Sequence, residues 1–347
     1  MRDLFRRLHE IIAAGEDAVL VSTVSSRGSV PRGSGAHMLV TKDGRASGTI
    51  GGGEAEFRAE QAAKEALRAG ANAARRYVLR QNEEDSLDSV CGGDIEVYFR
   101  FIKGGDKTVT ALCERIEKAF EGVCACRLIL ELTEADDGLI AVYSDEDGCS
   151  DANVPSAVLE ERGTMPKVIE TEGRKFYSEL IVLPGKVYIF GGGHVSQKLV
   201  PCLASCDFRC VVLEDRPEFT DPALFGNLAE TRLVDMSDLG GLAAELTPDD
   251  LVCIMTRGHR HDYESVYYML KSKACYIGVI GSRTKIGKLH ERLIEDGFTE
   301  EDLKRLTTPI GIEIYSETPA EIAVSVTAQL IMVRAVKNGS RKAEKHS

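Results

Sequence analysis

Residues 187–196 read Val187-Tyr188-Ile189-Phe190-Gly191-Gly192-Gly193-His194-Val195-Ser196. Four β-branched or aromatic residues run into a Gly-x-Gly-x-x-Ser sequence, which resembles the dinucleotide-binding fingerprint between a strand and a helix. Gly191 permits the tight turn, and Gly193 lets a pyrophosphate approach the amides at the helix N-terminus. Ser196 stands where a third glycine is usual, and its small side chain still permits close helix–strand packing. This stretch therefore predicts a Rossmann-type domain.

The next predicted strand ends with the acidic residues that such a domain needs. Glu214 and Asp215 lie about 20 positions after the glycines, where a carboxylate binds the ribose hydroxyls of a dinucleotide. Arg216 would instead meet a 2′-phosphate. His194, directly after the glycines, joins this set of candidate cofactor-binding residues. The alternative is a Rossmann scaffold whose glycines serve only the turn or hold another anion.

The rest of the second half alternates strands and helices. Residues 250–255 and 274–280 are continuous apolar runs, as buried parallel strands are, and helices are expected at 262–272, 284–296 and 318–337. The first half predicts an α+β domain, with strands at 18–25, 36–41 and 94–102 and a helix at 54–69. We expect an α/β protein: an N-terminal α+β domain at 1–183, a doubly wound parallel sheet at 184–337, and a polar tail at 338–347.

Two further loops follow predicted buried strands, where the ligand crevice of an open α/β sheet lies. His259 and Asp262 follow the first strand, and would bind a ligand or transfer protons. Asp262 would alternatively cap the next helix. After the second strand, Ser282 is either a ligand contact or a helix cap, and Arg283 would face phosphate. The two histidines, at 259 and 261, define no metal geometry, so we expect no metal.

A glycine-rich segment in the first half offers a second anion site. Arg27 and Arg32 flank one glycine-rich loop. The residues that run from a second such loop into a helix are Gly51, Gly52, Gly53 and Glu54. Their amides would cradle an anion beside the two arginines. A pair of tight turns is the alternative, because glycine serves any position with positive φ.

Ten cysteines occur in the chain. Cys91 is followed by two glycines in an acidic stretch, which favours a solvent-accessible position. It is therefore a candidate catalytic thiol. The alternative is that this segment is only a structural turn. Most of the others are interpreted as small buried hydrophobic residues, among them Cys113, Cys253 and Cys275.

Composition excludes several classes of protein. The chain of 347 residues is 43% hydrophobic and 28% charged, as in ordinary globular proteins, and its length suits two domains. Its formal net charge of −12 repels phosphate backbones, so we expect no nucleic-acid binding. No signal peptide is apparent, and no run approaches the roughly 18 apolar residues of a membrane span. We therefore expect no membrane association and a cytoplasmic location.

Taken together, these motifs resemble the XdhC/CoxI family, the accessory factors of xanthine dehydrogenase and related molybdenum hydroxylases. The matching stretches follow one order along nearly the whole chain: residues 25–35, 48–54, 91–93, 190–195, 214–218, 256–262, 276–283 and 309–325. The sequence departs from the family pattern at Val30, Ser196, Arg257 and Tyr315.

The resemblance implies a chaperone that binds molybdenum cofactor (molybdopterin), assists its sulfuration by a cysteine desulfurase, and inserts it into a xanthine dehydrogenase-like client. It implies a maturation factor more than an enzyme, and we expect a homo-oligomer, namely a homodimer. Two alternatives stay open. The Rossmann motif alone permits an NAD(P)-dependent oxidoreductase, or a nucleotide-sensing interaction module without catalysis.

Overall fold

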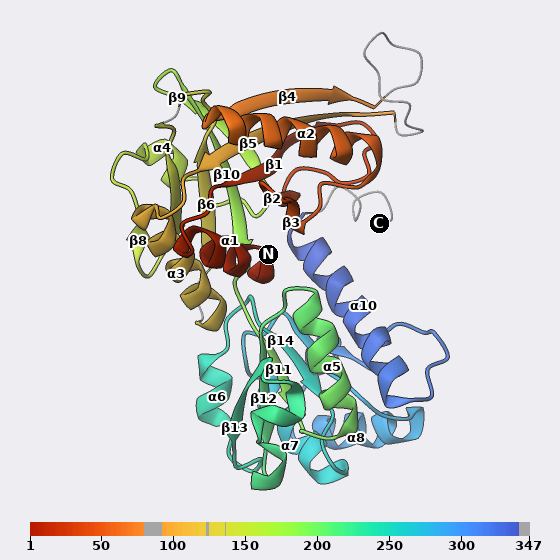
Figure 1. Ribbon diagram of the computed structural model, residues 1–347. Helices are drawn as coiled ribbons and strands as arrows, with labels where there is room; N and C mark the ends of the chain where they lie inside the picture. The colour runs from red at the N-terminus through yellow and green to blue at the C-terminus, as the bar shows by residue number, and fades with distance from the viewer. Residues whose placement is uncertain (80–91, 123–124, 136, 340–347) are drawn as a thin grey trace. The chain divides into compact units, whose positions relative to one another are not determined.

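The computed structural model describes residues 1–79, 92–122, 125–135 and 137–339, with the backbone alone at His259 and Arg283. The chain divides into two compact units, Met1–Leu183 and Pro184–Ser347. Figure 1 draws the first unit in red to yellow-green and the second in green to blue.

The first unit contains two antiparallel five-stranded sheets. The first sheet has the order β3-β2-β1-β5-β4 and consists of β1 (Ala18–Arg27), β2 (His37–Thr41), β3 (Gly44–Gly48), β4 (Ala73–Val78) and β5 (Asp94–Ile102). The second has the order β8-β7-β6-β10-β9 and consists of β6 (Cys126–Glu131), β7 (Ile140–Ser144), β8 (Gly148–Cys149), β9 (Lys167–Thr171) and β10 (Arg174–Val182). Antiparallel pairing throughout agrees with the predicted α+β class.

Helices cover these sheets according to their apolar faces. They are α1 (Arg2–Ala13), α2 (Gly53–Ala69), α3 (Lys107–Glu121) and the short α4 (Ser156–Leu159). Leu4, Leu8 and Ile11 of α1 recur at helical spacing and share one core with α3 and one face of each sheet. The buried alanines of α2 pack on the other face of the first sheet.

A buried polar chain connects the two sheets of this unit. Nδ1 of His37 lies 2.8 Å from the Ser22 hydroxyl, and its Nε2 lies 2.6 Å from Oε2 of Glu179. The Tyr177 hydroxyl donates to the same oxygen at 2.7 Å. Burial by itself raises the pKa of Glu179, but the His37 ring and the hydrogen bonds outweigh it and lower that pKa. Because Ser22 is fully buried, the array joins the sheets and offers no nucleophile to solvent.

The second unit is built on a parallel six-stranded sheet. Its strands are β11 (Val187–Phe190), β12 (Cys210–Glu214), β13 (Ala229–Leu233), β14 (Leu251–Ile254), β15 (Tyr276–Val279) and β16 (Leu306–Thr307). In the order β13-β12-β11-β14-β15-β16, β12 and β13 extend the sheet on one side of β11, and the last three strands extend it on the other side. The chain therefore crosses back over β11 before it enters β14, and all neighbouring strands are parallel. This is the predicted doubly wound Rossmann-type sheet, with its topological switch point beside the glycine loop.

Helices lie on both faces of this sheet (Figure 1). The α-helices are α5 (His194–Ser205), α6 (Gly240–Glu245), α7 (His259–Met269), α8 (Arg283–Glu295), α9 (Glu300–Leu303) and α10 (Pro319–Lys337), with 3₁₀ turns η1 (Pro217–Phe219) and η2 (Pro222–Phe225). One core holds α5 and α10 against one face, and another holds α6, α7 and α8 against the other. Helix α10 begins with a capping box, in which the Thr318 hydroxyl accepts from the Glu321 amide at 3.2 Å.

Helix α10 is unusually apolar around its circumference. By length and composition alone it is long enough to cross a membrane, and 33% of that window is buried. Such evidence is weak, because core helices of soluble proteins pass the same test. In this unit Ala323, Val326 and Leu330 of α10 pack into the core beside α5.

The cysteines divide between the core and the surface. Cys113, Cys126, Cys210 and Cys253 are buried, as predicted for small hydrophobic residues, whereas the prediction for Cys275 is wrong because this residue is exposed. Burial raises the pKa of the Cys113 thiol to about 12. Such core thiols stay protonated near neutral pH and are unsuited to nucleophilic chemistry.

Candidate functional site

The glycine loop after β11 lies tightly against the loop after β14. Gly191 has φ 101°, and a Cβ on it would lie 2.5 Å from the carbonyl oxygen of Met255. Only glycine meets both conditions. The two loops on either side of the switch point therefore touch at the carboxyl edge of the sheet, where open α/β proteins bind ligands.

The N-terminus of α5 is open at this edge. Gly193 is the N-cap and makes no side-chain capping bond, and no atom lies within 4 Å of the position that a Cβ would occupy. His194, the first helical residue, is exposed, whereas Ser196 is buried and its hydroxyl donates to the carbonyl of Gly191. Helix N-terminal amides without an internal partner attract anions, and here space lies beside them.

Glu214, at the end of β12, turns inward and is almost fully buried. Its Oε2 accepts from the Gly192 amide at 2.8 Å and from Arg216 at 2.9 Å, and its Oε1 accepts from the Asp215 amide at 3.1 Å. Burial alone would raise the pKa of Glu214, but the bonds from Arg216 and its other donors lower it to about 2. Glu214 therefore holds the glycine loop to β12 as a permanent anion.

This arrangement also determines the state of Arg216. Its guanidinium forms two bonds to Glu214 and lies 3.9 Å over the ring of Phe219. The positive charge predicted to meet a 2′-phosphate is thus already neutralised by a buried carboxylate. Asp215, in contrast, remains partly exposed at the same strand end.

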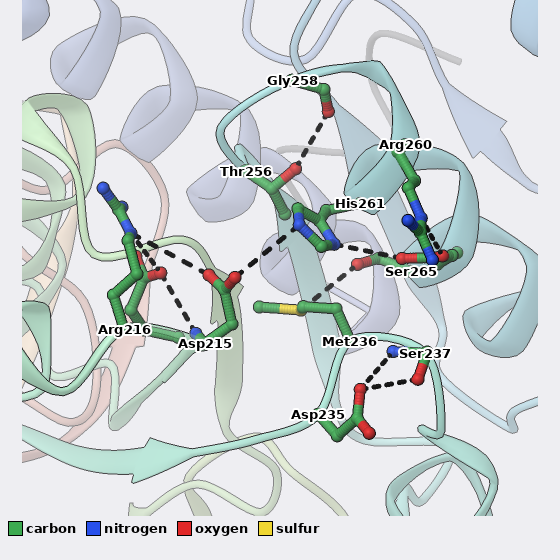
Figure 2. Close-up of polar contacts among 12 residues, drawn as sticks. Asp215, Arg216, Asp235, Met236, Ser237, Thr256, Gly258, Arg260, His261 and Ser265 are labelled. Carbon is green, nitrogen blue, oxygen red and sulfur yellow. Dashed lines mark hydrogen bonds and ion pairs between the residues drawn. The ribbon is translucent and has the colours of Figure 1, made fainter.

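Asp215 faces α7 through His261, as Figure 2 shows. Its Oδ2 lies 3.6 Å from Nε2 of His261, whose Nδ1 lies 3.0 Å from Oε2 of Glu264. The neighbouring Glu214 carboxylate and partial burial raise the pKa of Asp215. A partly exposed carboxylate at this strand end has the position of a ribose ligand.

The loop after β14 presents a second open helix N-terminus. Gly258 is the N-cap of α7, with φ 101°, no side-chain capping bond and no atom near a would-be Cβ. Asp262 was the alternative cap for this helix, but it lies inside the first turn. Its Oδ1 accepts from the Thr256 amide at 3.1 Å and hydroxyl at 2.7 Å, and its Oδ2 pairs with Lys285. Asp262 therefore shapes the loop and joins it to α8.

The remaining candidate residues at this edge of the sheet lie at the N-termini of α7 and α8. Ser282 is the N-cap of α8 and accepts from the Lys285 amide at 3.4 Å, as its capping alternative predicted. His259 and Arg283 begin α7 and α8, and their side chains lie outside the described part of the structure. The sheet thus gathers every sequence-predicted candidate of the second unit at one edge.

The basic loop of the first unit packs against the glycines that follow Cys91. A Cβ on Gly93 would lie 2.4 Å from the carbonyl oxygen of Arg27 and 2.6 Å from that of Ser29. Cys91 itself lies outside the described residues. Arg32 is exposed and donates to the carbonyl of Thr49 at 3.1 Å, so the two glycine-rich loops lie together.

The second glycine-rich turn is already filled by a carboxylate of the chain. Oε2 of Glu56 accepts from the amides of Ile50 at 2.9 Å and Gly52 at 3.2 Å and from the hydroxyl of Thr49, and Oε1 accepts from Arg45. Burial opposes ionisation, but these bonds prevail and lower the pKa of Glu56. The sequence analysis missed this residue, although a glutamate four positions after Gly52 on a helix was a usable signal.

Glu54 does not belong to this arrangement, because it is exposed and pairs with Arg58 at 2.8 Å. Gly51 lies against Pro31 and Arg32, whereas Gly52 and Gly53 have open space at the Cβ position. The turn therefore forms an anion cradle whose anion is internal. Among the described residues, no group of three or more His, Cys, Asp or Glu side chains could hold a metal ion.

Both units match models of known protein families. Residues 187–330 match the family model of the XdhC Rossmann domain, and residues 11–78 match that of the XdhC and CoxI family. A protein of Bacillus subtilis (strain 168), described as a probable xanthine dehydrogenase subunit, is 24% identical over 346 residues, covering 96% of this chain and 98% of the relative. The "Uncharacterized protein YqeB" of Escherichia coli (strain K12) is 27% identical over 317 residues, or 91% of this chain, which spans only 43% of that relative.

A solved structure resembles the whole chain. A crystal structure from Bacillus halodurans, described as a xanthine dehydrogenase, has a TM-score of 0.75 and 25% identity, and the match covers 98% of this chain and 97% of that one. The fold of both units is therefore shared with this protein.

Proposed function

The chain belongs to the XdhC and CoxI family, and from this premise we propose that it is an accessory factor for a xanthine dehydrogenase-type molybdenum hydroxylase. The names of two relatives refer to xanthine dehydrogenase, and both match this chain over nearly its full length. The proposed partners are the hydroxylase client and a cysteine desulfurase, and the proposed location is the cytoplasm.

The ligand of this accessory role is proposed to be molybdenum cofactor, whose phosphate needs backbone amides and space. The observation that carries this proposal is the open, uncapped N-terminus of α5 at Gly193, with the uncapped N-terminus of α7 on the neighbouring loop. These residues fit an anionic phosphate. The turn at Gly52 does not fit one, because Glu56 occupies it. Residues near Gly193 and Gly258 would hold the phosphate, and the cofactor would supply the molybdenum and the dithiolene.

Co-purification tests this proposal. The protein is isolated from cells that make molybdenum cofactor, the pterin is oxidised, and its fluorescence is measured per mole of protein. We expect pterin in the wild type and a loss of at least tenfold in Gly193→Val, because the new side chain fills the space beside the helix N-terminus. Gly287→Val is the matched control, since Gly287 also has open space and lies on the surface of α8. Background pterin in the wild type, with no binding on titration, would refute the proposal.

A dinucleotide is the second candidate ligand, and Asp215 favours it. Its partly exposed carboxylate at the end of β12 suits ribose hydroxyls, whereas Glu214 neutralises the arginine that a 2′-phosphate would need. Calorimetry with NAD(H) and NADP(H) separates the candidates: the geometry predicts that NAD(H) binds at least tenfold more tightly. Hydride transfer to a substrate would further support an oxidoreductase, and equal or absent binding of both dinucleotides would remove this candidate.

A further inference from the structure

The side chain of His261 lies beside Asp215 at the candidate site (Figure 2). His261 is in the first turn of α7, which follows β14, and Asp215 directly follows β12. Strand β11 lies between β12 and β14 in the sheet, so the two side chains approach each other across the switch point. Both are partly open to solvent, with side-chain exposures of 27% and 30%. They therefore face solvent at the edge of the sheet where the glycine loop begins.

The ring of His261 is held in place by two charged side chains of the same helix. Its Nδ1 lies 3.0 Å from Oε2 of Glu264, and Oε1 of Glu264 accepts from Nε of Arg260 at 2.9 Å. A carboxylate only accepts hydrogen bonds, so Nδ1 carries the hydrogen of the bond to Glu264. Glu264 therefore fixes the ring in the orientation that directs Nε2 toward Asp215.

The two facing atoms are spaced for a third group. Nε2 of His261 and Oδ2 of Asp215 are 3.6 Å apart, which is too long for a direct hydrogen bond. Within the described part of the chain, Nε2 has no hydrogen-bond partner. A hydroxyl suits both atoms, because it donates to the carboxylate and either donates to a bare Nε2 or accepts from a protonated one. The pair thus offers two convergent polar atoms to the hydroxyls of a ligand.

The other carboxylates at this edge are engaged within the chain. Glu214 accepts from the glycine loop, and Oδ1 of Asp235 accepts from the amide of Ser237 at 2.9 Å and from its hydroxyl at 2.7 Å. Asp262 joins its own loop to α8. Of these four carboxylates, Asp215 is the one within ion-pair distance of His261.

We propose that Asp215 and His261 together bind the vicinal hydroxyls of a ribose, and that the ligand of this edge is a ribonucleotide. This inference rests on the proposed phosphate site at Gly193, which would hold the other recognised group of the same ligand. Because Arg216 is already paired with Glu214, free hydroxyls fit this place better than a 2′-phosphate. His261 is then a specificity-determining residue, and Glu264 is a positioning residue that acts through the imidazole.

Calorimetric titration of the full-length protein with inorganic pyrophosphate, ADP and 2′-deoxy-ADP tests this proposal. We expect the wild type to bind ADP about fivefold more tightly than 2′-deoxy-ADP, because one hydroxyl contact is lost in the analogue. His261→Ala should abolish this preference and leave the affinity for pyrophosphate unchanged. Glu264→Ala should reduce the preference, because the ring is no longer oriented. His9→Ala is the matched control, since His9 also pairs with a glutamate, Glu117, at 3.1 Å in the first unit.

The outcomes separate the ribose site from the phosphate site. Equal affinity of the wild type for ADP and 2′-deoxy-ADP overturns the ribose site, whereas pyrophosphate binding that is lost in Gly193→Val would still support the phosphate site. A preference that persists in His261→Ala assigns the discrimination to Asp215 alone and overturns the role of His261. Loss of pyrophosphate binding in His261→Ala would show that the residue is merely structural. If neither nucleotide binds, the inference is wrong, and the pterin measurement decides the proposed function independently.

Discussion

Gly191 and Gly193 lie two residues apart in the same loop but have different structural roles. Gly191 combines φ 101° with a Cβ position 2.5 Å from the Met255 carbonyl oxygen, whereas Gly193 has an ordinary φ of −72° and open surroundings. Gly191→Ala should therefore destabilise the second unit by roughly 2–3 kcal/mol, through strain and displacement of the β14 loop. Gly193→Ala should change stability by less than about 1 kcal/mol. Calorimetric unfolding of both variants measures this contrast, and equal losses would contradict it.

Glu214 is the residue whose ionisation the site depends on most. Its pKa of about 2 in the folded protein lies below the ordinary value of 4.5, so its charge stabilises the fold above pH 4.5, and this contribution is lost as the pH falls towards 2. Glu214→Gln should cost about 2 kcal/mol at pH 7, because the four hydrogen bonds that the carboxylate accepts from Gly192, Asp215 and Arg216 weaken. The gap between wild type and variant should narrow between pH 4.5 and 3. Thermal unfolding across this range gives the answer, and a gap independent of pH would show that Glu214 is not the ion described.

At the scale of elements, the N-terminus of α2 is capped by a carboxylate from its own first turns. Removal of that carboxylate in Glu56→Ala leaves the Ile50 and Gly52 amides without their acceptor and should cost about 1–2 kcal/mol. Inorganic phosphate should then enter the vacated cradle and raise the melting temperature of this variant, but not that of the wild type. Glu54→Ala is the matched control, because Glu54 is exposed on the same turn. A phosphate response in the control as well would indicate a nonspecific salt effect.

The strands that could be predicted from the sequence are those whose residues are all buried. β11, β14 and β15 are buried on both faces and read as continuous apolar runs. β4, β9 and β13 lie at sheet edges with mixed exposure, so their sequences show no regular alternation. Helix α7 begins three residues before its predicted start, because Gly258 at positive φ serves as the N-cap.

The sequence predicted where the candidate site lies, but not which of its residues form hydrogen bonds and ion pairs with one another. Strand-end loops of a parallel sheet meet at one edge, and local sequence indicates that arrangement. The bond from the Gly192 amide to Glu214 depends on the parallel register of β11 and β12, which places Phe190 beside Leu213. Register of this kind arises from tertiary pairing, so Arg216 looked available in the sequence although Glu214 holds it.

Across the whole molecule, two glycine-rich turns with similar sequences differ in whether their anion-binding position is open or already occupied. The turn of the second unit is open at Gly193, and that of the first unit is filled by Glu56. A bound anion is therefore expected on the second unit, and we propose that the first unit contributes Cys91 and the basic loop beside Gly93. This division predicts that a variant in either unit can abolish accessory function without changing the fold of the other.

Cys91 provides the test of this division in the first unit. Cys91→Ser should reduce activation of the proposed molybdenum hydroxylase client at least tenfold, because a hydroxyl cannot replace a thiolate in the proposed sulfuration of the cofactor, while thermal stability should stay within about 0.5 kcal/mol of wild type. Cys275→Ser is the matched control, since Cys275 is exposed in the second unit. Gly93→Ala should behave differently, because its Cβ would collide with the Arg27 carbonyl and destabilise the first unit. Client activity in cells that carry each variant distinguishes the two effects, and full activation by Cys91→Ser would remove the thiol from the proposed mechanism.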